Sequence, residues 1–389
     1  MVEWKKLGDV CSVFDGTHQT PKYTESGVKF VSVENIDNLY FTNKYISKMA
    51  YSENYKIKPQ KGDVLMTRIG DVGRCAIITK DEPIAFYVSL ALLRPNPEFI
   101  LCNYLKHIIE SKTGRIELRK RTLLTAVPLK INLGEIGKIR IPIPSLEEQK
   151  RIVGILDTFT DSIENLKQQI AQRRKQYEYY RDQLLDLEGK DGVEMKTLGD
   201  VLISLKTGLN PRKNFVLNSP NSNNYYITVR ELGLFDIKPT DKTDKVTDEA
   251  LQLINNRSNL EAGDVLFSGT GTIGRTALVT EHPHNWNIKE GVYTLKPRKN
   301  LIISRFLIEL LHSNIIIKKV DSLVVGDPIR SIPMKSLVLI SIPLPPLSEQ
   351  QRIVSILDTF EASISNLEAQ LAQRQKQYEY YRNQLLTFE

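Results

Sequence analysis

The 389-residue sequence holds few of the side chains that most often bind metals. Its three cysteines, Cys11, Cys75 and Cys102, form no CxxC pair and leave an odd number. We therefore expect a cytoplasmic protein whose cysteines are packing residues and which lacks structural zinc. The five histidines form no HExxH motif, and the HPH sequence at 282–284 has no further ligand at a suitable spacing, which favours a loop. We expect neither a metal nor a cofactor.

Long apolar runs are missing as well. The longest, from Leu307 to Ile317, is interrupted by Glu309 and His312 and falls short of the ~18–20 residues that cross a membrane. Residues 1–10 carry lysines with no apolar core behind them, so we expect no secretory signal. Hydrophobic residues at 41% and charged residues at 25% are ordinary for a folded protein, which excludes the disordered and low-complexity classes.

The motifs of common enzyme classes are absent too. The sequence has no GxSxG elbow and no NPPY-like tetrapeptide beside a glycine-rich cofactor loop, so we expect a chain that transfers no methyl group and is not an enzyme. One segment, GTGTIGRT at 269–276, satisfies GxGxxG and approaches a phosphate-binding P-loop. However, Arg275 stands in place of the P-loop lysine, and the strand-like TALVT follows instead of a helix.

This glycine-rich segment also has a counterpart earlier in the chain. KGDVLMTRIGDVGR at 61–74 returns as AGDVLFSGTGTIGR at 262–275, with Arg68 where the later copy has Gly269. A segment in which the first glycine and the lysine are both dispensable is not a P-loop, so a nucleotide-dependent enzyme is the weakest hypothesis. We interpret both segments as turns between strands. Each would use two glycines for conformations that other residues resist: Gly70 and Gly73, and Gly271 and Gly274.

The main positive feature is an internal repeat. Residues 141–188 and 342–389 align at an offset of 201, with 33 of 48 positions identical. KKLGDV at 5–10 also returns as KTLGDV at 196–201. At roughly 100–200 residues per domain the length predicts two or three domains. We expect an α+β fold with a pseudo-two-fold repeat, each copy being a globular block followed by a long helix.

The repeated segments are predicted to be helices. Across 152–187 the seam residues recur at alternating steps of four and three, which is typical of a coiled coil, and 353–388 has the same steps. We expect two helices of about 40 residues, ~60 Å long, paired as an intramolecular antiparallel coiled coil. Ser145 and Glu148 predict a capping box at the first helix. Faces outside the seam are kept between the copies as well, which a plain dimerisation rod or stalk would not require.

The net charge of +7 is distributed unevenly. The positive excess lies in residues 1–140 and 195–341, whereas the two helical segments are slightly negative. Such blocks are compatible with a polyanionic partner such as DNA, because neutralising phosphates releases counterions.

Two divergent blocks alternate with near-identical helices, each introduced by IPxPxLxEQxxIVxILD at 141–157 and 342–358. This pattern strongly resembles the specificity (S) subunit of type I restriction-modification systems. The LGDV and GDVL...GR segments fit the family's target-recognition domains, so the resemblance covers essentially the whole chain. It implies target-recognition domain 1 at 1–140, spacer helix 1 at 141–188, a linker at 189–194, target-recognition domain 2 at 195–341 and spacer helix 2 at 342–389.

The resemblance implies a function without catalysis. Each globular domain would read one half of a bipartite DNA site, and the helices would set the spacing. The implied partners are double-stranded DNA, methyltransferase (modification) subunits, with two copies suggested by the two similar helix surfaces, and ATP-dependent restriction subunits through the complex. The alternative is a stand-alone DNA-binding coiled-coil scaffold or transcription factor. A neighbouring gene for an adenine methyltransferase would distinguish the two.

Residue chemistry selects candidates for DNA contact. Arginine suits guanine, asparagine and glutamine suit adenine, and lysine suits phosphate. In the first domain the candidates lie on one polar loop and around the glycine turn: Thr17, His18, Gln19, Thr20, Lys22, Tyr23, Thr67, Arg68 and Arg74. In the second domain they are Asn210, Arg212, Lys213, Asn214, Asn223, Asn224, Tyr225, Ser268, Thr270, Thr272 and Arg275.

Overall fold

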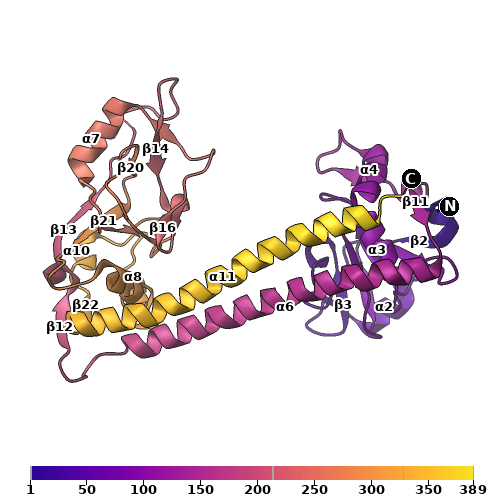
Figure 1. The fold of residues 1–389 in the computed structure, drawn as a ribbon, viewed down its shortest axis with the longest axis horizontal. Coiled ribbons are helices and arrows are strands. Elements are labelled where there is room, and N and C mark those ends of the chain that lie inside the picture. The colour runs from indigo at the N-terminus through magenta and orange to yellow at the C-terminus, as the bar shows by residue number, and fades with distance from the viewer. Residues whose placement is uncertain (1, 213, 327, 389) are drawn as a thin grey trace. The chain divides into compact units, whose positions relative to one another are not determined.

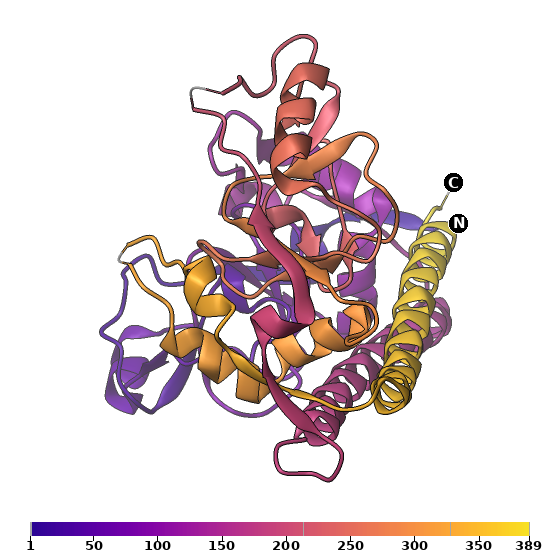
Figure 2. The same cartoon turned by 90° about the vertical axis from the view of Figure 1, so that its left-hand side faces the viewer.

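The computed structural model describes residues 2–212, 214–326 and 328–388. The chain forms two compact units (Figures 1 and 2). Unit 1 comprises residues 1–168 and 367–389, and unit 2 comprises residues 169–366. Each unit therefore contains one globular domain and one segment from each of the two long helices.

Unit 1 is built on a four-stranded antiparallel sheet ordered β2-β8-β5-β6. A three-stranded sheet, β4-β3-β7, contains the parallel pair β3 and β7, and β1 pairs with β11. The strands are β1 (Glu3–Lys6), β2 (Cys11–Asp15), β3 (Val28–Val31), β4 (Tyr45–Ile46), β5 (Val64–Thr67), β6 (Cys75–Ile77), β7 (Ile84–Phe86), β8 (Leu90–Pro95), β9 (Thr122–Leu123), β10 (Lys130–Ile131) and β11 (Arg140–Ile143). The helices of its domain are α1 (Leu7–Val10), α2 (Lys48–Asn54), α3 (Cys102–Glu110), α4 (Lys112–Arg121) and α5 (Leu133–Ile136), with the 3-10 helix η1 (Val33–Asn35).

Unit 2 repeats this topology almost strand for strand. Its sheets are β13-β21-β18-β19 and β17-β14-β20, and β12 pairs with β22. Figure 2 turns this unit toward the viewer, and α7 lies at the opposite end of the unit from α8. The strands are β12 (Glu194–Thr197), β13 (Leu202–Thr207), β14 (Asn224–Ile227), β15 (Leu232–Gly233), β16 (Asp236–Ile237), β17 (Lys245–Val246), β18 (Val265–Ser268), β19 (Thr276–Leu278), β20 (Trp286–Ile288), β21 (Val292–Pro297) and β22 (Ser341–Leu344). The helices are α7 (Asp248–Ser258), α8 (Ser304–His312), α9 (Asn314–Ser322) and α10 (Met334–Leu337), with η2 (Leu198–Val201) and η3 (Val229–Glu231).

The repeated segments form two long helices, α6 (Leu146–Leu185) and α11 (Leu347–Leu385), as their heptad spacing predicts. In unit 1 the two helices run antiparallel, and Phe159 stacks on Tyr381 with ring centroids 5.2 Å apart. In unit 2 the equivalent pair, Phe360 and Tyr180, stacks at 5.3 Å. The two contacts are related by the offset of 201 residues, so the pseudo-two-fold repeat extends to the packing of side chains. The α+β fold and the helix pairing are confirmed.

The seam contains one arginine in each helix, and both have an aromatic partner. The guanidinium carbon of Arg173 lies 6.0 Å from the centre of the Phe360 ring, and that of Arg374 lies 5.7 Å from the Phe159 ring. A cation over a ring face is attracted by its quadrupole, which explains why a charge is tolerated at this seam position.

The start of α6 corrects one detail of the predicted cap. Ser145 Oγ accepts a hydrogen bond from the backbone amide of Glu148 at 3.2 Å, as a capping residue does. The Glu148 carboxylate, however, pairs with Arg151 one turn further along, at 2.6 and 2.8 Å. In a full capping box the Glu148 carboxylate would also accept a hydrogen bond from the Ser145 backbone amide. The Arg151 guanidinium engages that carboxylate instead, so only the serine half of the predicted capping box forms.

A buried glutamine attaches each long helix to its domain. Gln149 is fully buried; its carbonyl accepts from the Leu101 amide at 2.9 Å, and its amide donates to the carbonyls of Phe99 and Pro144. Gln350 makes the equivalent three bonds in unit 2. Because each bond satisfies a backbone group at a helix or strand end, this glutamine fixes where the domain meets the helix. We call these two residues the glutamine clamps.

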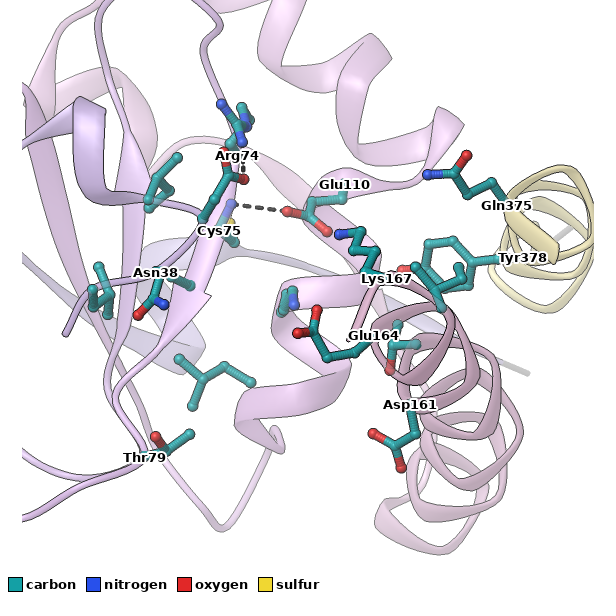
Figure 3. A pocket seen from close by; sticks show the side chains of 18 of the residues that line it. Asn38, Arg74, Cys75, Thr79, Glu110, Asp161, Glu164, Lys167, Gln375 and Tyr378 are labelled. Atoms are coloured by element: carbon teal, nitrogen blue, oxygen red, sulfur yellow. Dashed lines mark hydrogen bonds and ion pairs between the residues drawn. The ribbon is translucent and has the colours of Figure 1, made fainter. Parts of the chain in front are cut away.

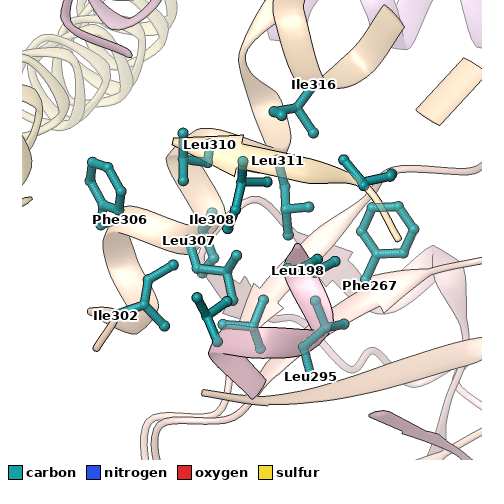
Figure 4. Packing of buried hydrophobic residues seen from close by; sticks show 14 of the residues in the cluster. Leu198, Phe267, Leu295, Ile302, Phe306, Leu307, Ile308, Leu310, Leu311 and Ile316 are labelled. Carbon is teal, nitrogen blue, oxygen red and sulfur yellow. The ribbon is translucent and has the colours of Figure 1, made fainter. Parts of the chain in front are cut away.

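The cores lie between the sheets and the helices that follow them. In unit 2, side chains of α8 pack against Leu198, Phe267 and Leu295 (Figure 4). Burial of each such side chain contributes roughly 1.5–3 kcal/mol. In unit 1, Cys11 and Cys75 are buried in the corresponding cluster, which confirms them as packing residues, and burial raises the pKa of Cys11 to about 12. Across the described residues, no helix has the length and apolarity needed to span a membrane.

Candidate DNA-reading surface

Strand direction explains why the candidate residues of each domain gather at one edge of the sheet. β2 and β5 both pair antiparallel with β8, so they run parallel to each other and end at the same edge. The polar loop follows β2, and the glycine turn follows β5. In unit 2, β13 and β18 are both antiparallel to β21, with the same consequence. We call this edge, with the loop and turn that leave it, the reading edge.

In unit 1 one carboxylate links the loop to the turn. Asp15, the last residue of β2, pairs with Arg68 on the turn and lies 2.9 Å from Nε2 of His18 on the loop. The Arg68 side chain is only 11% exposed, and it also donates to the backbone carbonyls of Ile131 and Val88. Arg68 therefore positions the loop. Gln19, Thr20, Lys22 and Tyr23 are exposed on the loop, and His18 is exposed as well although its ring contacts Asp15.

In unit 2 the reading edge is more open. Arg275 is exposed, and its guanidinium donates to the carbonyl of Val229 at 3.3 Å. Arg212 and Asn214 are also exposed on the loop after β13, and Thr272 is exposed at the tip of the glycine turn. Lys213, a further candidate, lies outside the described residues.

The glycine segments are turns between antiparallel strands, as predicted. β5 pairs with β6, and β18 pairs with β19. The φ angles of Gly70, Gly73, Gly271 and Gly274 lie between 77° and 91°, in the region that favours glycine. A strand follows each turn, so neither segment has the helix N-terminus on which a P-loop holds phosphate.

Three candidates are buried and cannot reach a base edge, so these predictions are corrected. Thr67 is 2% exposed, and its hydroxyl donates to the Asp71 carbonyl and accepts from the Arg74 amide. Ser268 is fully buried and makes the equivalent bonds in unit 2. Asn224 is 6% exposed and donates to Asp248 at 2.7 Å. All three satisfy backbone or side-chain groups of their own domain, a role their polar character could not distinguish from DNA contact.

Arg74 faces a different surface. It pairs with Asp37, which raises the pKa of the guanidinium, and it lines a cleft of about 790 Å³ between the domain and the long helices of unit 1 (Figure 3). The cleft wall carries both signs of charge, including Lys167, Glu164 and Glu110. Such a mixture does not favour a phosphate-rich ligand.

The remaining candidates are partly exposed: Thr17, Asn210, Tyr225 and Thr270, with Asn223 exposed. No group of three or more His, Cys, Asp or Glu side chains within the described ranges could hold a metal. His282 and His284 are exposed, and their rings pack edge to face at 5.8 Å.

One element at the reading edge was missed. The hairpin formed by β9 and β10 packs beside the glycine turn of unit 1, where the Gly70 amide donates to the Leu129 carbonyl at 2.8 Å. In unit 2 the Gly271 amide donates to the Arg330 carbonyl at the same distance. Extending the offset of 201 beyond the helices would have aligned these two segments, although they share almost no residues.

Comparison with known proteins decides the family. The sequence matches the family described as type I restriction modification DNA specificity domain over residues 1–173 and again over 190–375. The chain belongs to this family. The resemblance drawn from the helix-leading motif is thereby confirmed, and the family is one of DNA specificity.

Two relatives and one solved structure place the chain within the family. A Haemophilus influenzae protein named as a type I restriction enzyme specificity subunit is 30% identical over 67% of this chain and 66% of its own length. The Escherichia coli EcoR124I/EcoR124II specificity subunit is 32% identical over 64% of this chain and 63% of its own length. The chain thus spans a little under two thirds of either relative. The type I S subunit from M. genitalium shares the fold, with a TM-score of 0.55 at 15% identity, covering 100% of this chain and 97% of that one.

Proposed function

We propose that this chain is the DNA sequence-specificity subunit of a type I restriction-modification complex, in which each globular domain reads one half of a bipartite site. The observation that carries the proposal is the duplicated reading edge. Both domains place a loop and a glycine turn at the same sheet edge, yet the exposed residues differ between them. Two domains with the same backbone arrangement but different exposed side chains would read two different half-sites.

The long helices would serve two purposes in this proposal. They would set the spacing between the half-sites, and their outer faces would dock modification subunits, through which ATP-dependent restriction subunits join the complex. Tyr179 and Tyr380 occupy equivalent positions, are 61% and 60% exposed, and pack edge to face on Tyr180 and Tyr381. Exposed tyrosines held by neighbours are typical anchors of protein interfaces. Two such sites would accept two copies of one partner.

The function is tested by sequencing the methylated positions of the host genome with and without the gene for this chain. A bipartite motif that disappears with the gene supports the proposal. An unchanged set of methylated positions would instead favour a DNA-binding scaffold or transcription factor without enzyme partners.

The docking site is tested by substitution. Tyr380→Ala should remove one modification subunit from the complex, and Tyr179→Ala the other, as measured by the mass of the purified assembly. Phe41→Ala, which removes an aromatic side chain that is 82% exposed on the globular domain of unit 1, is the matched control and should leave the mass unchanged. An intact assembly with both helix tyrosines replaced would refute docking at these faces.

A further inference from the structure

The hairpin segments beside the two glycine turns carry exposed apolar side chains. In unit 1 the hairpin comprises residues 122–131, in which Val127 is 99% exposed, Leu124 54% and Leu129 41%. In unit 2 the equivalent segment comprises 323–326 and 328–332, in which Ile329 is 69% exposed and Val325 53%. Exposing apolar surface in water is unfavourable, so a cluster of this kind at one tip indicates a binding partner.

Both hairpins are fixed to the reading edge by the same backbone bonds. The Ile131 amide donates to the Arg68 carbonyl, and the Ile332 amide donates to the Gly269 carbonyl, each at 2.9 Å. Together with the bonds from Gly70 and Gly271, these make each hairpin an extension of its glycine turn. The two segments share only this isoleucine, TLLTAVPLKI against LVVGDPIRSI, yet both keep an exposed apolar tip. The two hairpins thus occupy the same place in each domain but differ in sequence. Elements that read two different DNA targets require this combination.

Charge identifies the occupant. α4 ends in Arg119, Lys120 and Arg121 directly before the first hairpin, and Lys130 closes it. Lys120 and Arg121 share the Glu117 carboxylate, so the cluster keeps a positive excess, with Arg119 and Lys130 exposed. In unit 2, Arg330 is exposed within the hairpin, with its guanidinium 3.8 Å from the exposed carboxylate of Asp321. An apolar tip flanked by cations matches a DNA groove, where phosphates line the rim and the thymine C5-methyl group is the apolar feature of the floor.

We infer that the two hairpins are further sequence-reading elements, whose apolar tips contact thymine methyl groups in the major groove. This inference rests on the proposed DNA-specificity function and adds to it a ligand feature and the residues that recognise it. Val127 and Leu124 read in the first domain, and Ile329 and Val325 in the second. The flanking cations hold phosphates without discriminating sequence.

The test uses the full chain assembled with its modification subunits and a DNA duplex carrying its bipartite site. Val127→Ser should weaken binding about three- to tenfold, the value of losing a methyl-sized apolar contact. It should relax one position in one half-site only. Met49→Ser is the matched control, because Met49 is 69% exposed on α2, on the opposite side of the domain from α4 (Figure 1). It should bind as the wild type does. Since Val127 is almost fully exposed, thermal unfolding should be unchanged.

A second arm changes the DNA instead of the protein. Replacing each thymine of the half-site by deoxyuridine removes only the methyl group. One such replacement should weaken the wild-type complex by the same factor and leave the Val127→Ser complex unaffected, because the two changes remove one contact. An equal loss in both proteins would overturn the inference, as would a half-site without any A·T pair.

The remaining outcomes separate this inference from the proposed function. If the wild-type complex selects no DNA sequence, the proposed function itself fails. If it selects a bipartite site and Val127→Ser selects the same site with the same affinity, only the hairpin inference fails. Loss of a modification subunit from the Val127→Ser complex, with an unchanged DNA motif, would reassign the tip to protein docking and overturn the inference.

Discussion

In both units an aspartate and a tyrosine at equivalent positions of the long helices meet different residues of the globular domain. In unit 1 the imidazole of His107 lies 2.8 Å from Asp157 on α6 and 3.0 Å from the hydroxyl of Tyr378 on α11. Asn103 donates to the same aspartate at 2.6 Å. On the domain side the contact consists of an amide and an imidazole, and the His107 side chain is almost wholly buried.

In unit 2 the equivalent helix residues are Asp358 and Tyr177, but here they contact an ion pair of the globular domain. Arg305 pairs with Glu309 and with Asp358, each at 2.9 Å, and with Glu361 at 2.6 Å. Glu361 is specific to α11, because α6 has Thr160 at the equivalent position. The Tyr177 hydroxyl donates a hydrogen bond to Glu309 at 2.7 Å, and burial raises the pKa of the Glu309 carboxyl. Arg305 and Glu309 stand where Asn103 and His107 stand in unit 1. The difference teaches that the helices form a largely shared platform, and that each domain must supply a matching pair of residues, with the helix adding Glu361 where that pair includes Arg305.

The largest effect is expected from breaking the ion pair of unit 2. Arg305→Met leaves the Glu309 carboxylate buried without its cation, which should lower the free energy of unfolding of unit 2 by about 3–5 kcal/mol. Hydrogen exchange of the α8 amides measures this locally. Arg352→Met is the matched control, because Arg352 pairs with Glu349 on an exposed helix face, where a pair contributes at most about 1 kcal/mol. Similar losses in both variants would contradict a special role for Arg305.

The second prediction moves one pair into the other unit. His107→Glu alone should place a carboxylate beside Asp157 and lower the stability of unit 1 by about 3 kcal/mol. The double variant Asn103→Arg/His107→Glu recreates the Arg305–Glu309 pair, without the partner that Glu361 provides in unit 2, and should recover part of that loss. Exchange rates of the α3 amides report both. If the double variant is no more stable than the single one, the two sets are not interchangeable and the platform idea is wrong.

The third prediction concerns acid. Burial, then Arg181 and Arg305, lower the pKa of His312 to about 4. Because unfolding returns the imidazole to ~6.5, the unfolded chain binds the proton more tightly, and unit 2 loses up to ~3 kcal/mol as the pH falls from ~6.5 to ~4. His312→Gln should abolish this part of the pH dependence. Urea unfolding at pH 7 and at pH 5, followed by circular dichroism, measures the change in the free energy of unfolding between the two pH values. If the His312→Gln variant loses as much stability between pH 7 and pH 5 as the wild type does, His312 is excluded as the cause.

The smallest effect is expected from replacing the glutamine clamps, which are the same in both units. Gln149→Leu and Gln350→Leu each leave a buried backbone amide and two carbonyls without their partner, which should cost about 1–3 kcal/mol in the respective unit. Since the glutamine clamps make the same three bonds, the two losses should be equal within error by hydrogen exchange at α3 and α8. Clearly unequal losses would show that the repeat does not extend to this joint.

The features that follow from short-range pattern were predictable from the sequence. The heptad steps give α6 and α11, and the glycine spacing gives the turns after β5 and β18. Partners distant in sequence were not. Nothing near His107 indicates that it would meet Asp157 and Tyr378, because the latter lies 271 residues away.

The candidate site was predictable only in part, for the same reason. The presence of polar residues on a loop does not reveal whether a hydroxyl faces solvent or its own backbone, so the predictions for Thr67 and Ser268 were wrong. His18, Gln19, Thr20 and Lys22 are exposed, as a polar loop predicts. The sequence does not single out the hairpin at 122–131, because apolar residues are usually buried. In the structure this hairpin packs beside the glycine turn, and its apolar side chains are exposed.

The central claim is that each globular domain is an independent DNA reader attached to a largely shared helical platform, and domain replacement tests it most directly. Residues 195–341, which include Arg305 and Glu309, are replaced by the equivalent domain of a relative, and the methylated motif is determined by genome sequencing in cells that supply the modification subunits. The account predicts a motif in which one half is new, while the other half and the spacing between them are unchanged. A motif in which both halves change together, or in which the spacing changes, would contradict it.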